Sequence, residues 1–352
     1  MTYPRPTLHP RFKLTLRAFM FSALLLGATP AVADKYVLIS HAPDSDSWWN
    51  VIKNSLKQAG DDYGVQVDYR NPATGDIAEM ARLIEQAAAA NYDGVMVTIA
   101  DFNVLQRALE KVRAKRIPLI TINSGSAEQS EQLGAIMHVG QPEYDAGHAA
   151  GLRAKAAGVK RFLCVNHYAT NPVSFERCKG FADAIGADFR ASTLDTGGVD
   201  PSAVESKVSA YLRQHPDTQG ILALGPDAAS PTLRLLDKAG LTNKIWFATF
   251  DLSDDISRAI KDGTVQFAID QQPFLQGYIP VAVMVGMKAD RVRGAATADS
   301  VQAALKADPK AAARFEEYGV TPVYGPRHIS SGPGFITAEN LSKVEKYAGQ
   351  YR

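Results

Sequence analysis

Short apolar runs and longer amphipathic segments alternate along the chain from residue 36 onward. The apolar runs expected to form strands are residues 36–40, 65–69, 94–98, 118–122, 161–165, 220–224, 245–250 and 265–269. The segments with the hydrophobic period of helices are residues 49–63, 76–89, 103–114, 143–157, 174–184, 202–214, 228–239, 253–261 and 274–287. Most strand candidates are almost continuously apolar, which is typical of parallel strands covered by helices on both faces. The pattern therefore predicts an α/β fold with doubly wound parallel sheets.

Two such units follow one another, residues 36–138 and residues 141–269. No low-complexity tract or block of like charges interrupts them. We therefore expect two lobes with a cleft between them. Because ligands of open α/β sheets bind outside the carboxyl ends of the strands, the residues that follow each strand are the candidate site.

Polar and aromatic side chains occupy those strand ends. The candidate ligand-binding residues are Asp46, Trp48, Trp49, Asp101, Asn123, Gln141, Arg177, Asp227, Asp251 and Gln271. Carboxylates, amides and one guanidinium suit a neutral polyhydroxylated ligand, because each ligand hydroxyl both donates and accepts hydrogen bonds. Flat aromatic rings suit its C–H faces. Each residue also has a simpler interpretation, since aspartates at these positions can cap helices, tryptophans can pack in the core, and Arg177 can be a surface charge.

The composition and charge limit the classes of partner. The 352 residues include 38 basic and 37 acidic ones, a formal net charge of +1. This balance lacks the positive excess that usually accompanies binding to nucleic acid or to anionic membranes. Hydrophobic residues make up 46% of the chain, which is ordinary for a folded globular protein.

The first 33 residues have the pattern of a secretory signal peptide. Arg5, Arg11, Lys13 and Arg17 precede an apolar run at residues 18–27, and small residues follow at positions 31 and 33. That run is about half of the roughly 20 residues that a membrane-spanning helix needs. We expect cleavage after Ala33, export to the periplasm and no membrane insertion afterwards; a retained membrane anchor is the alternative.

The chain has two cysteines, Cys164 and Cys178. In an exported protein they can form one disulfide, and two buried free thiols are the alternative. Two cysteines without CxxC or HxxxH spacing do not predict a metal site.

The sequence motifs of common enzymes are missing. The chain has no GxSxG elbow, no GxxxxGK[ST] loop and no HExxH, and no GxGxxG follows the first strand. No nucleophile, base and acid are brought together by the pattern. We therefore expect a binding protein without cofactor or metal, and keep a secreted α/β enzyme as an alternative.

With these features together, the chain resembles the periplasmic solute-binding proteins of sugar ABC importers, and more narrowly the ribose-binding type. The resemblance is carried by residues 40–49, 118–123, 138–140, 175–181, 250–251 and 271–273. It implies that Trp48 and Trp49 enclose a sugar beside Asp46, and that Arg177, Asp251 and Gln271 bind its hydroxyls. It also implies a monomer that delivers its ligand to an ABC transporter permease.

The resemblance further implies a hinge with three crossings, near residues 139–142, near 271–274 and before Tyr324. The N-terminal lobe is then expected to hold residues 34–140 and 273–321, and the C-terminal lobe residues 141–272 and 322–352.

Two departures from the family pattern concern the ligand. Asn123 and Ser124 stand where many pyranose binders have Asp-Arg, and residues 225–228 replace the usual Asn-Asp pair with a Pro-Asp-Ala sequence. That sequence is similar to proteins that bind autoinducer-2 or rhamnose. The ligand can then be a polyol, a branched or deoxy sugar, or a furanose-like signal as readily as ribose or galactose. An alternative function is that of a ligand-sensing receptor that signals to a membrane kinase or chemoreceptor.

Overall fold

The computed structural model describes residues 1–4, 33–168, 171–293 and 297–352. Within these ranges the chain forms two sheets, one of seven strands and one of six, and both are covered by helices. The predicted architecture of two α/β lobes is confirmed. The predicted signal peptide falls mainly on residues 5–32, which lie outside the described residues.

The first sheet has the strand order β11 (Val323–Gly325), β12 (His328–Ser330), β5 (His138–Gly140), β4 (Leu119–Ile122), β3 (Gly94–Val97), β1 (Lys35–Ile39) and β2 (Gln66–Arg70). All neighbouring strands are parallel except β11, which runs antiparallel to β12. The strands β1–β5 are therefore aligned with their carboxyl ends at one edge of the sheet.

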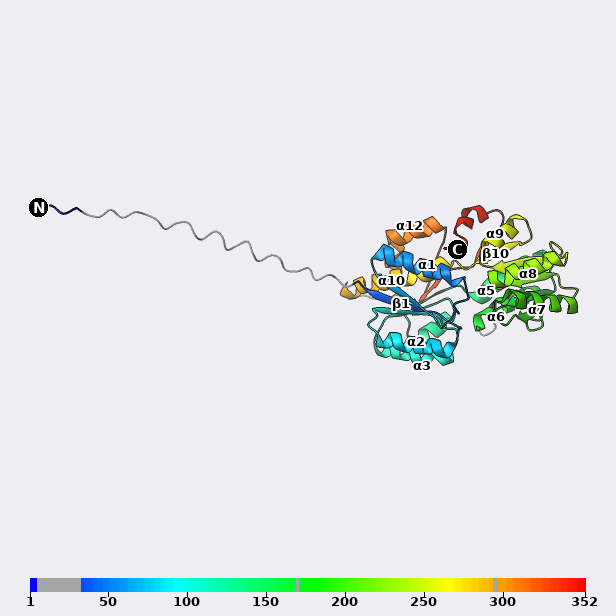
Figure 1. Ribbon diagram of the computed structural model, residues 1–352, viewed down its shortest axis with the longest axis horizontal. Coiled ribbons are helices and arrows are strands. Elements are labelled where there is room, and N and C mark those ends of the chain that lie inside the picture. The colour runs from blue at the N-terminus through cyan, green and yellow to red at the C-terminus, as the bar shows by residue number, and fades with distance from the viewer. Residues whose placement is uncertain (5–32, 169–170, 294–296) are drawn as a thin grey trace. The chain divides into compact units, whose positions relative to one another are not determined.

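Alternate side chains of β1 enter the cores on opposite faces of this sheet, as the period of a strand requires. Tyr36 and Leu38 pack with α1 (Trp49–Tyr63) and α10 (Pro273–Arg293). Val37 and Ile39 pack with α2 (Ile77–Ala89) and α3 (Phe102–Ala114). Figure 1 shows the two helix pairs on opposite sides of β1.

The second sheet has the strand order β13 (Gly334–Ile336), β10 (Phe267–Asp270), β9 (Trp246–Phe250), β8 (Gly220–Ala223), β6 (Phe162–Asn166) and β7 (Thr193–Asp195). β13 is antiparallel to β10, and the other pairs are parallel. Its faces are covered in the same alternating way. Phe162 and Cys164 pack with α5 (Glu143–Ala156) and α6 (Pro172–Ile185), whereas Leu163 and Val165 pack with α7 (Pro201–Gln214) and α8 (Pro226–Lys238).

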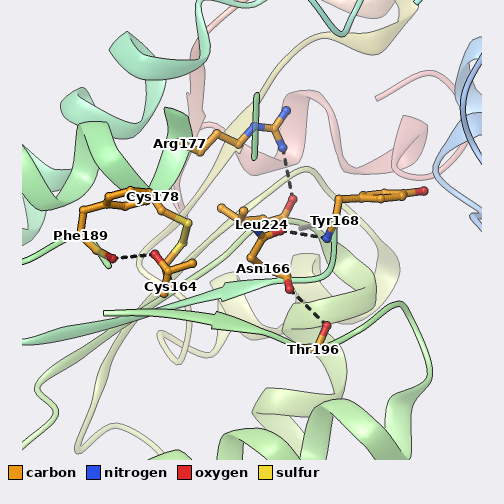
Figure 2. Close-up of a disulfide and its surroundings, with 9 residues drawn as sticks. Cys164, Asn166, Tyr168, Arg177, Cys178, Phe189, Thr196 and Leu224 are labelled. Carbon is orange, nitrogen blue, oxygen red and sulfur yellow. Dashed lines mark hydrogen bonds between the residues drawn. A yellow bond between two sulfur atoms is a disulfide. The ribbon is translucent and has the colours of Figure 1, made fainter. Parts of the chain in front are cut away.

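The shorter elements complete the two lobes. They are α4 (Ala127–Gln132), α9 (Asp254–Lys261), α11 (Ala298–Lys306), α12 (Pro309–Tyr318), and the 3-10 turns η1 (Leu341–Lys343) and η2 (Glu345–Tyr347). Among the described residues, none of the helices has both the length and the apolar character needed to span a bilayer. A disulfide joins Cys164 in β6 to Cys178 in α6 (Figure 2), with 5.8 Å between their Cα atoms.

The last crossing between the sheets differs from the prediction. The hairpin of β11 and β12 belongs to the first sheet, because β12 pairs with β5 through the register of Ile329 with Val139. The assignment of residues 322–330 to the C-terminal lobe is therefore wrong. The crossing lies between Ser330 and Gly334, after Tyr324 and not before it. The hairpin was missed because its three-residue strands are defined by pairing with a distant part of the chain.

Candidate functional site

A small cavity, with about 50 Å³ of space for the centres of water-sized molecules and part of it open to solvent, lies where the carboxyl ends of strands from both sheets meet. It is lined by His41, Asp46, Trp48, Trp49, Asn123, His167, Tyr168, Asn171, Val173, Ser174, Arg177, Leu224, Gly225, Pro226, Asp227, Asp251 and Gln271. Within the described part of the chain, eight of the ten predicted ligand-binding residues line this cavity, and Asp101 and Gln141 do not.

Asp101 caps a helix outside the cavity. Its Oδ1 accepts a hydrogen bond of 3.0 Å from the backbone N–H of Val104, in the first turn of α3. This is the ordinary role of an aspartate before a helix. The structure therefore places Asp101 at the start of α3 as a helix cap, and not in the wall of this cavity.

Gln141 lies one layer behind the cavity wall. Its Nε2 donates a hydrogen bond of 2.8 Å to Oε2 of Glu143, which in turn holds Arg177. Gln141 is therefore placed to orient a lining residue, and it does not line the cavity itself.

Arg177 is fixed on nearly every side by buried groups. Its Nε and Nη2 donate to the two carboxylate oxygens of Glu143 at 2.6 and 2.7 Å. Its Nη1 donates to the carbonyl oxygen of Leu224 at 3.3 Å (Figure 2), and Nη2 also reaches Oε1 of Gln271 at 3.3 Å. Burial alone would lower the pKa of Arg177, but the charge and hydrogen bonds of Glu143 outweigh it and raise the pKa. The guanidinium is thus a charged, oriented donor whose charge is balanced by its partner.

Asp251 presents one unpaired oxygen at the end of β9. Oδ2 accepts a hydrogen bond of 2.7 Å from Nε2 of Gln271, whereas Oδ1 makes no well-formed hydrogen bond in the described part of the protein, although the nearby indole of Trp48 lowers the pKa of this carboxylate. Burial raises the pKa of Asp251 to about 7, and the charge of Arg177 opposes this rise. A buried acceptor without a partner is costly, so this oxygen is suited to a donor from a ligand.

The backbone is left-handed at two of these strand ends. The φ angle is +57° at Asn123, after β4, and +60° at Asp251, after β9. Asn and Asp adopt this region more readily than most residues, although at some conformational cost. The unusual backbone conformation therefore coincides with the positions that line the cavity.

Two further carboxylates, Asp46 and Asp227, are near enough to repel one another. Asp46 accepts a hydrogen bond of 3.0 Å from the backbone N–H of Trp48, and its other oxygen accepts one from the hydroxyl of Tyr168. Burial raises the pKa of Asp46. Burial, and then the charge of Asp46, raise the pKa of Asp227 to about 6. These oxygens favour a ligand that supplies hydrogen-bond donors.

The adjacent indole rings have different environments. Trp49 is buried, with 2% of its surface exposed, and belongs to the core beside α10. Trp48 is partly exposed, and its Nε1 makes no well-formed hydrogen bond among the described residues, although the indole is near enough to Asp251 to lower the pKa of that carboxylate. The ring centroids are 5.3 Å apart, with planes at 81° to one another. Trp48 thus offers a donor and an aromatic surface, whereas Trp49 supports it from the core.

A periplasmic binding protein domain matches residues 36–290, most of the chain. The chain belongs to this family.

Curated relatives and solved structures agree with this assignment. The chain is 24% identical to a xylose/arabinose-binding protein of Sulfolobus acidocaldarius over 59% of its own length and 54% of that protein. It is 23% identical to a ribose import binding protein of Haemophilus influenzae over 74% of this chain and 89% of that one. A carbohydrate transporter from Acidothermus cellulolyticus 11B, solved in complex with myo-inositol, superposes with a TM-score of 0.75 at 28% identity, over 90% of this chain and 98% of that chain.

Several residues of this periplasmic binding protein's cavity were not among the predicted contacts. His41, His167, Tyr168, Asn171 and Ser174 also line the wall. Most of them follow β1 or β6, so the same strand-end rule could have included them. Asn171 links the lobes, since its Nδ2 donates to Oγ of Ser124 at 2.9 Å and lies 3.3 Å from Nε2 of His41.

The imidazoles in the wall are suited to hydrogen bonding without charge. Burial lowers the pKa of His41 to about 4 and that of His167 to about 3. Both side chains are therefore neutral at physiological pH. In the described ranges, no group of three or more His, Cys, Asp or Glu side chains is arranged to hold a metal ion.

Proposed function

We propose that this protein captures one small, neutral polyhydroxylated molecule, a sugar or polyol, in the cavity between its sheets and delivers it to an ABC import permease. The observation that carries the proposal is the lining of that cavity: an oriented arginine, three carboxylates, amides and an indole ring at the strand ends of both sheets. Membership of the periplasmic binding protein family supports it. The ribose import protein among its relatives favours transport over the sensory alternative.

The hydrogen-bonding groups favour a ligand with several hydroxyl groups. Asp251 Oδ1, a buried acceptor, and Trp48 Nε1, a buried donor, make no well-formed hydrogen bond to the described residues, although the indole is near enough to this carboxylate to lower its pKa. A hydroxyl group can pair with either. Arg177 adds at most one N–H donor to the cavity, because Glu143, Leu224 and Gln271 take four of its five.

The charges favour a neutral ligand over an anionic one. Asp46, Asp227 and Asp251 line the cavity, and the positive charge of Arg177 is already balanced by Glu143. A phosphate or carboxylate on the ligand would meet this excess of negative charge in a partly desolvated site, where like charges repel strongly. We therefore expect sugar phosphates and sugar acids to be excluded.

The proposal also covers the oligomeric state, the location, the processing and the lack of catalysis. The protein acts as a monomer in the periplasm, is cleaved after Ala33, and turns over no substrate. N-terminal sequencing of the exported protein should begin at Asp34, and size-exclusion chromatography with light scattering should give the mass of one chain.

A thermal-shift screen followed by calorimetry tests the proposal. The panel contains pentoses, hexoses, deoxy sugars, linear polyols, inositols and autoinducer-2, with glucose 6-phosphate and glucuronate as anionic controls. A ligand at 100 times its dissociation constant should stabilise the folded state by about 2.7 kcal/mol. Saturable 1:1 binding of a neutral member, recovered unchanged after incubation, is the expected result. Binding of the anionic controls alone, binding of no member, or turnover of the bound compound would contradict the proposal.

A further inference from the structure

The disulfide closes the stretch of chain that supplies much of one wall of the cavity. Six lining residues lie between its two cysteines: His167, Tyr168, Asn171, Val173, Ser174 and Arg177. Figure 2 shows the sulfur–sulfur bond between β6 and α6, with Arg177 next to Cys178 along the helix and Tyr168 beyond the end of the strand. The bond is therefore adjacent to the site in sequence and in space.

On the strand side, the disulfide is anchored to the interior of a sheet. Cys164 lies in β6, where it pairs in register with Thr193 of β7 and with Leu222 of β8. Both cysteine side chains are fully buried. Because β6 is hydrogen-bonded on both edges, the strand provides a rigid reference and α6 is the element whose position the bond restricts.

On the helix side, the bond is attached next to the cationic residue of the site. Arg177 immediately precedes Cys178 in α6, and its contacts to Leu224 and Gln271 are both 3.3 Å. These distances are near the limit for a useful hydrogen bond, so a small shift of α6 would break them. The orientation of the guanidinium is thus sensitive to the position that the disulfide gives to the helix.

Other contacts hold α6 in the fold without covalent help. It packs so closely on α5 that a Cβ atom at Gly147 would lie 2.0 Å from the carbonyl oxygen of Arg177, and one at Gly180 would lie 2.1 Å from that of Tyr144. The rings of Phe162 and Phe181 are 4.5 Å apart between centroids. The lobe should therefore remain folded when the bond is removed.

We propose that the Cys164–Cys178 disulfide is a positioning element of the ligand site, which holds α6 and its Arg177 in the arrangement that binds ligand. The inference rests on the proposed function for its consequence in binding. A cross-link removes conformations that the segment would otherwise sample, so less ordering is needed when ligand binds. If α6 without the disulfide is in the arrangement that binds ligand about a tenth of the time, the apparent dissociation constant for the ligand rises about tenfold.

The test compares the wild-type protein with Cys164→Ala/Cys178→Ala. Should this variant fail to fold, Cys164→Val/Cys178→Ala is the second choice, because valine suits a strand and alanine a helix. Val204→Ala/Val208→Ala is the control for a loss of stability that does not involve the ligand site. Both positions are fully buried on α7, and no residue of this helix lines the cavity. Circular dichroism establishes that each variant is folded at the temperature of the measurements.

The first readout is amide hydrogen exchange without ligand, which depends on no assumption about the cargo. Amides of residues 167–168 and 173–178 should exchange about tenfold faster in the cysteine variant, whereas those of β6, α7 and α8 remain as in the wild type. The control variant should not accelerate exchange in these two stretches. Unchanged exchange there, or equal acceleration across the whole lobe, would overturn the proposal.

The second readout is the dissociation constant for the neutral compound that binds most tightly in the screen. It should rise about tenfold in the cysteine variant and stay within twofold of wild type in the control. Equal affinity of the cysteine variant and the wild type would overturn the positioning role while leaving the proposed function intact. If no compound binds the wild type, the proposed function fails and the exchange experiment alone decides the inference.

Discussion

Replacing Asp251 with asparagine should stabilise the protein at about pH 8 and weaken ligand binding. The side chain is 3% exposed, and one of its oxygens makes no well-formed hydrogen bond in the described part of the structure. Burial raises its pKa from 3.8 to about 7, although Arg177 opposes the rise. Asparagine has the same shape, and its carbonyl oxygen can accept the bond from Gln271. The substitution therefore removes a buried charge without leaving a cavity.

The pKa of Asp251 gives both the size and the sign of the effect. The shift from 3.8 to about 7 corresponds to about 4 kcal/mol of free energy that disfavours the ionised carboxylate in the folded state. Between these two values the folded protein holds a proton that the unfolded chain has lost, so the free energy of unfolding falls as the pH rises. The loss is complete above about pH 7. The asparagine variant has no such loss, so its advantage over wild type should grow from near zero at about pH 4 to at most about 4 kcal/mol at about pH 8.

Thermal unfolding followed by circular dichroism at the two pH values measures this difference. A change of 1 kcal/mol moves the melting temperature by roughly 2–4 °C in chains of 150–250 residues and by somewhat less in longer ones. The variant should therefore melt several degrees above wild type at about pH 8 and within a degree of it at about pH 4. Asp237→Asn, an exposed position on α8, is the control and should show no pH-dependent difference. An equal or lower melting temperature for Asp251→Asn at about pH 8, or the same difference at both pH values, would refute the reasoning. The same variant should bind ligand about 10- to 100-fold more weakly, because a ligand donor loses its charged acceptor.

Four further substitutions test stability and ligand binding. Trp49→Ala should lower the free energy of unfolding, measured by urea denaturation, by about 3–5 kcal/mol because the ring is in the core. Trp48→Ala should lower it much less and should mainly reduce the ligand affinity measured by calorimetry. Equal losses of stability in the two variants would contradict this division. Burial and the charge of Asp46 raise the pKa of Asp227 to about 6, so the ligand affinity of the wild type should fall as the pH decreases through 6. Calorimetry should show a shallower fall of the affinity for Asp227→Asn. Identical pH profiles of the two proteins would exclude Asp227 from the site. Gly147→Ala should lower the free energy of unfolding by about 1–3 kcal/mol, because the new Cβ would lie 2.0 Å from the carbonyl oxygen of Arg177. The melting temperature should fall accordingly. An unchanged melting temperature would contradict the close packing of α5 on α6.

The sequence pattern predicted the strands that carry their own hydrophobic signal and missed those that depend on distant partners. The runs in β1, β3 and β6 are apolar on both faces, so their identity as buried parallel strands is visible locally. The three-residue strands β5 and β7 are too short to show a period. β12 forms because His328–Ser330 pairs with His138–Gly140, about 190 positions earlier, and no local pattern reports that pairing.

The strand-end rule found most of the candidate site for a geometric reason. The carboxyl ends of parallel strands meet at one edge of a sheet, so residues such as Asn123 and Asp251 converge without any special motif. The rule failed where a local hydrogen bond decided the direction of the side chain, as in the cap that Asp101 makes to α3. It also could not reveal that Tyr168 would reach Asp46, 122 positions away, because that contact depends on how the two lobes meet.

The raised pKa values predict that ligand binding releases protons. Asp227 and Asp251, with pKa values of about 6 and about 7, are partly protonated near neutral pH. A ligand hydroxyl that donates to either carboxylate stabilises its ionised form and lowers its pKa. Wild-type binding measured by calorimetry at about pH 7 in phosphate and in Tris should therefore give different apparent enthalpies, because the buffer takes up the released proton with a different enthalpy in each case. Asp251→Asn should lose most of this buffer dependence while retaining measurable binding. Equal enthalpies for the wild type in both buffers would mean that no ligand group donates to these carboxylates, and that their burial serves the fold alone.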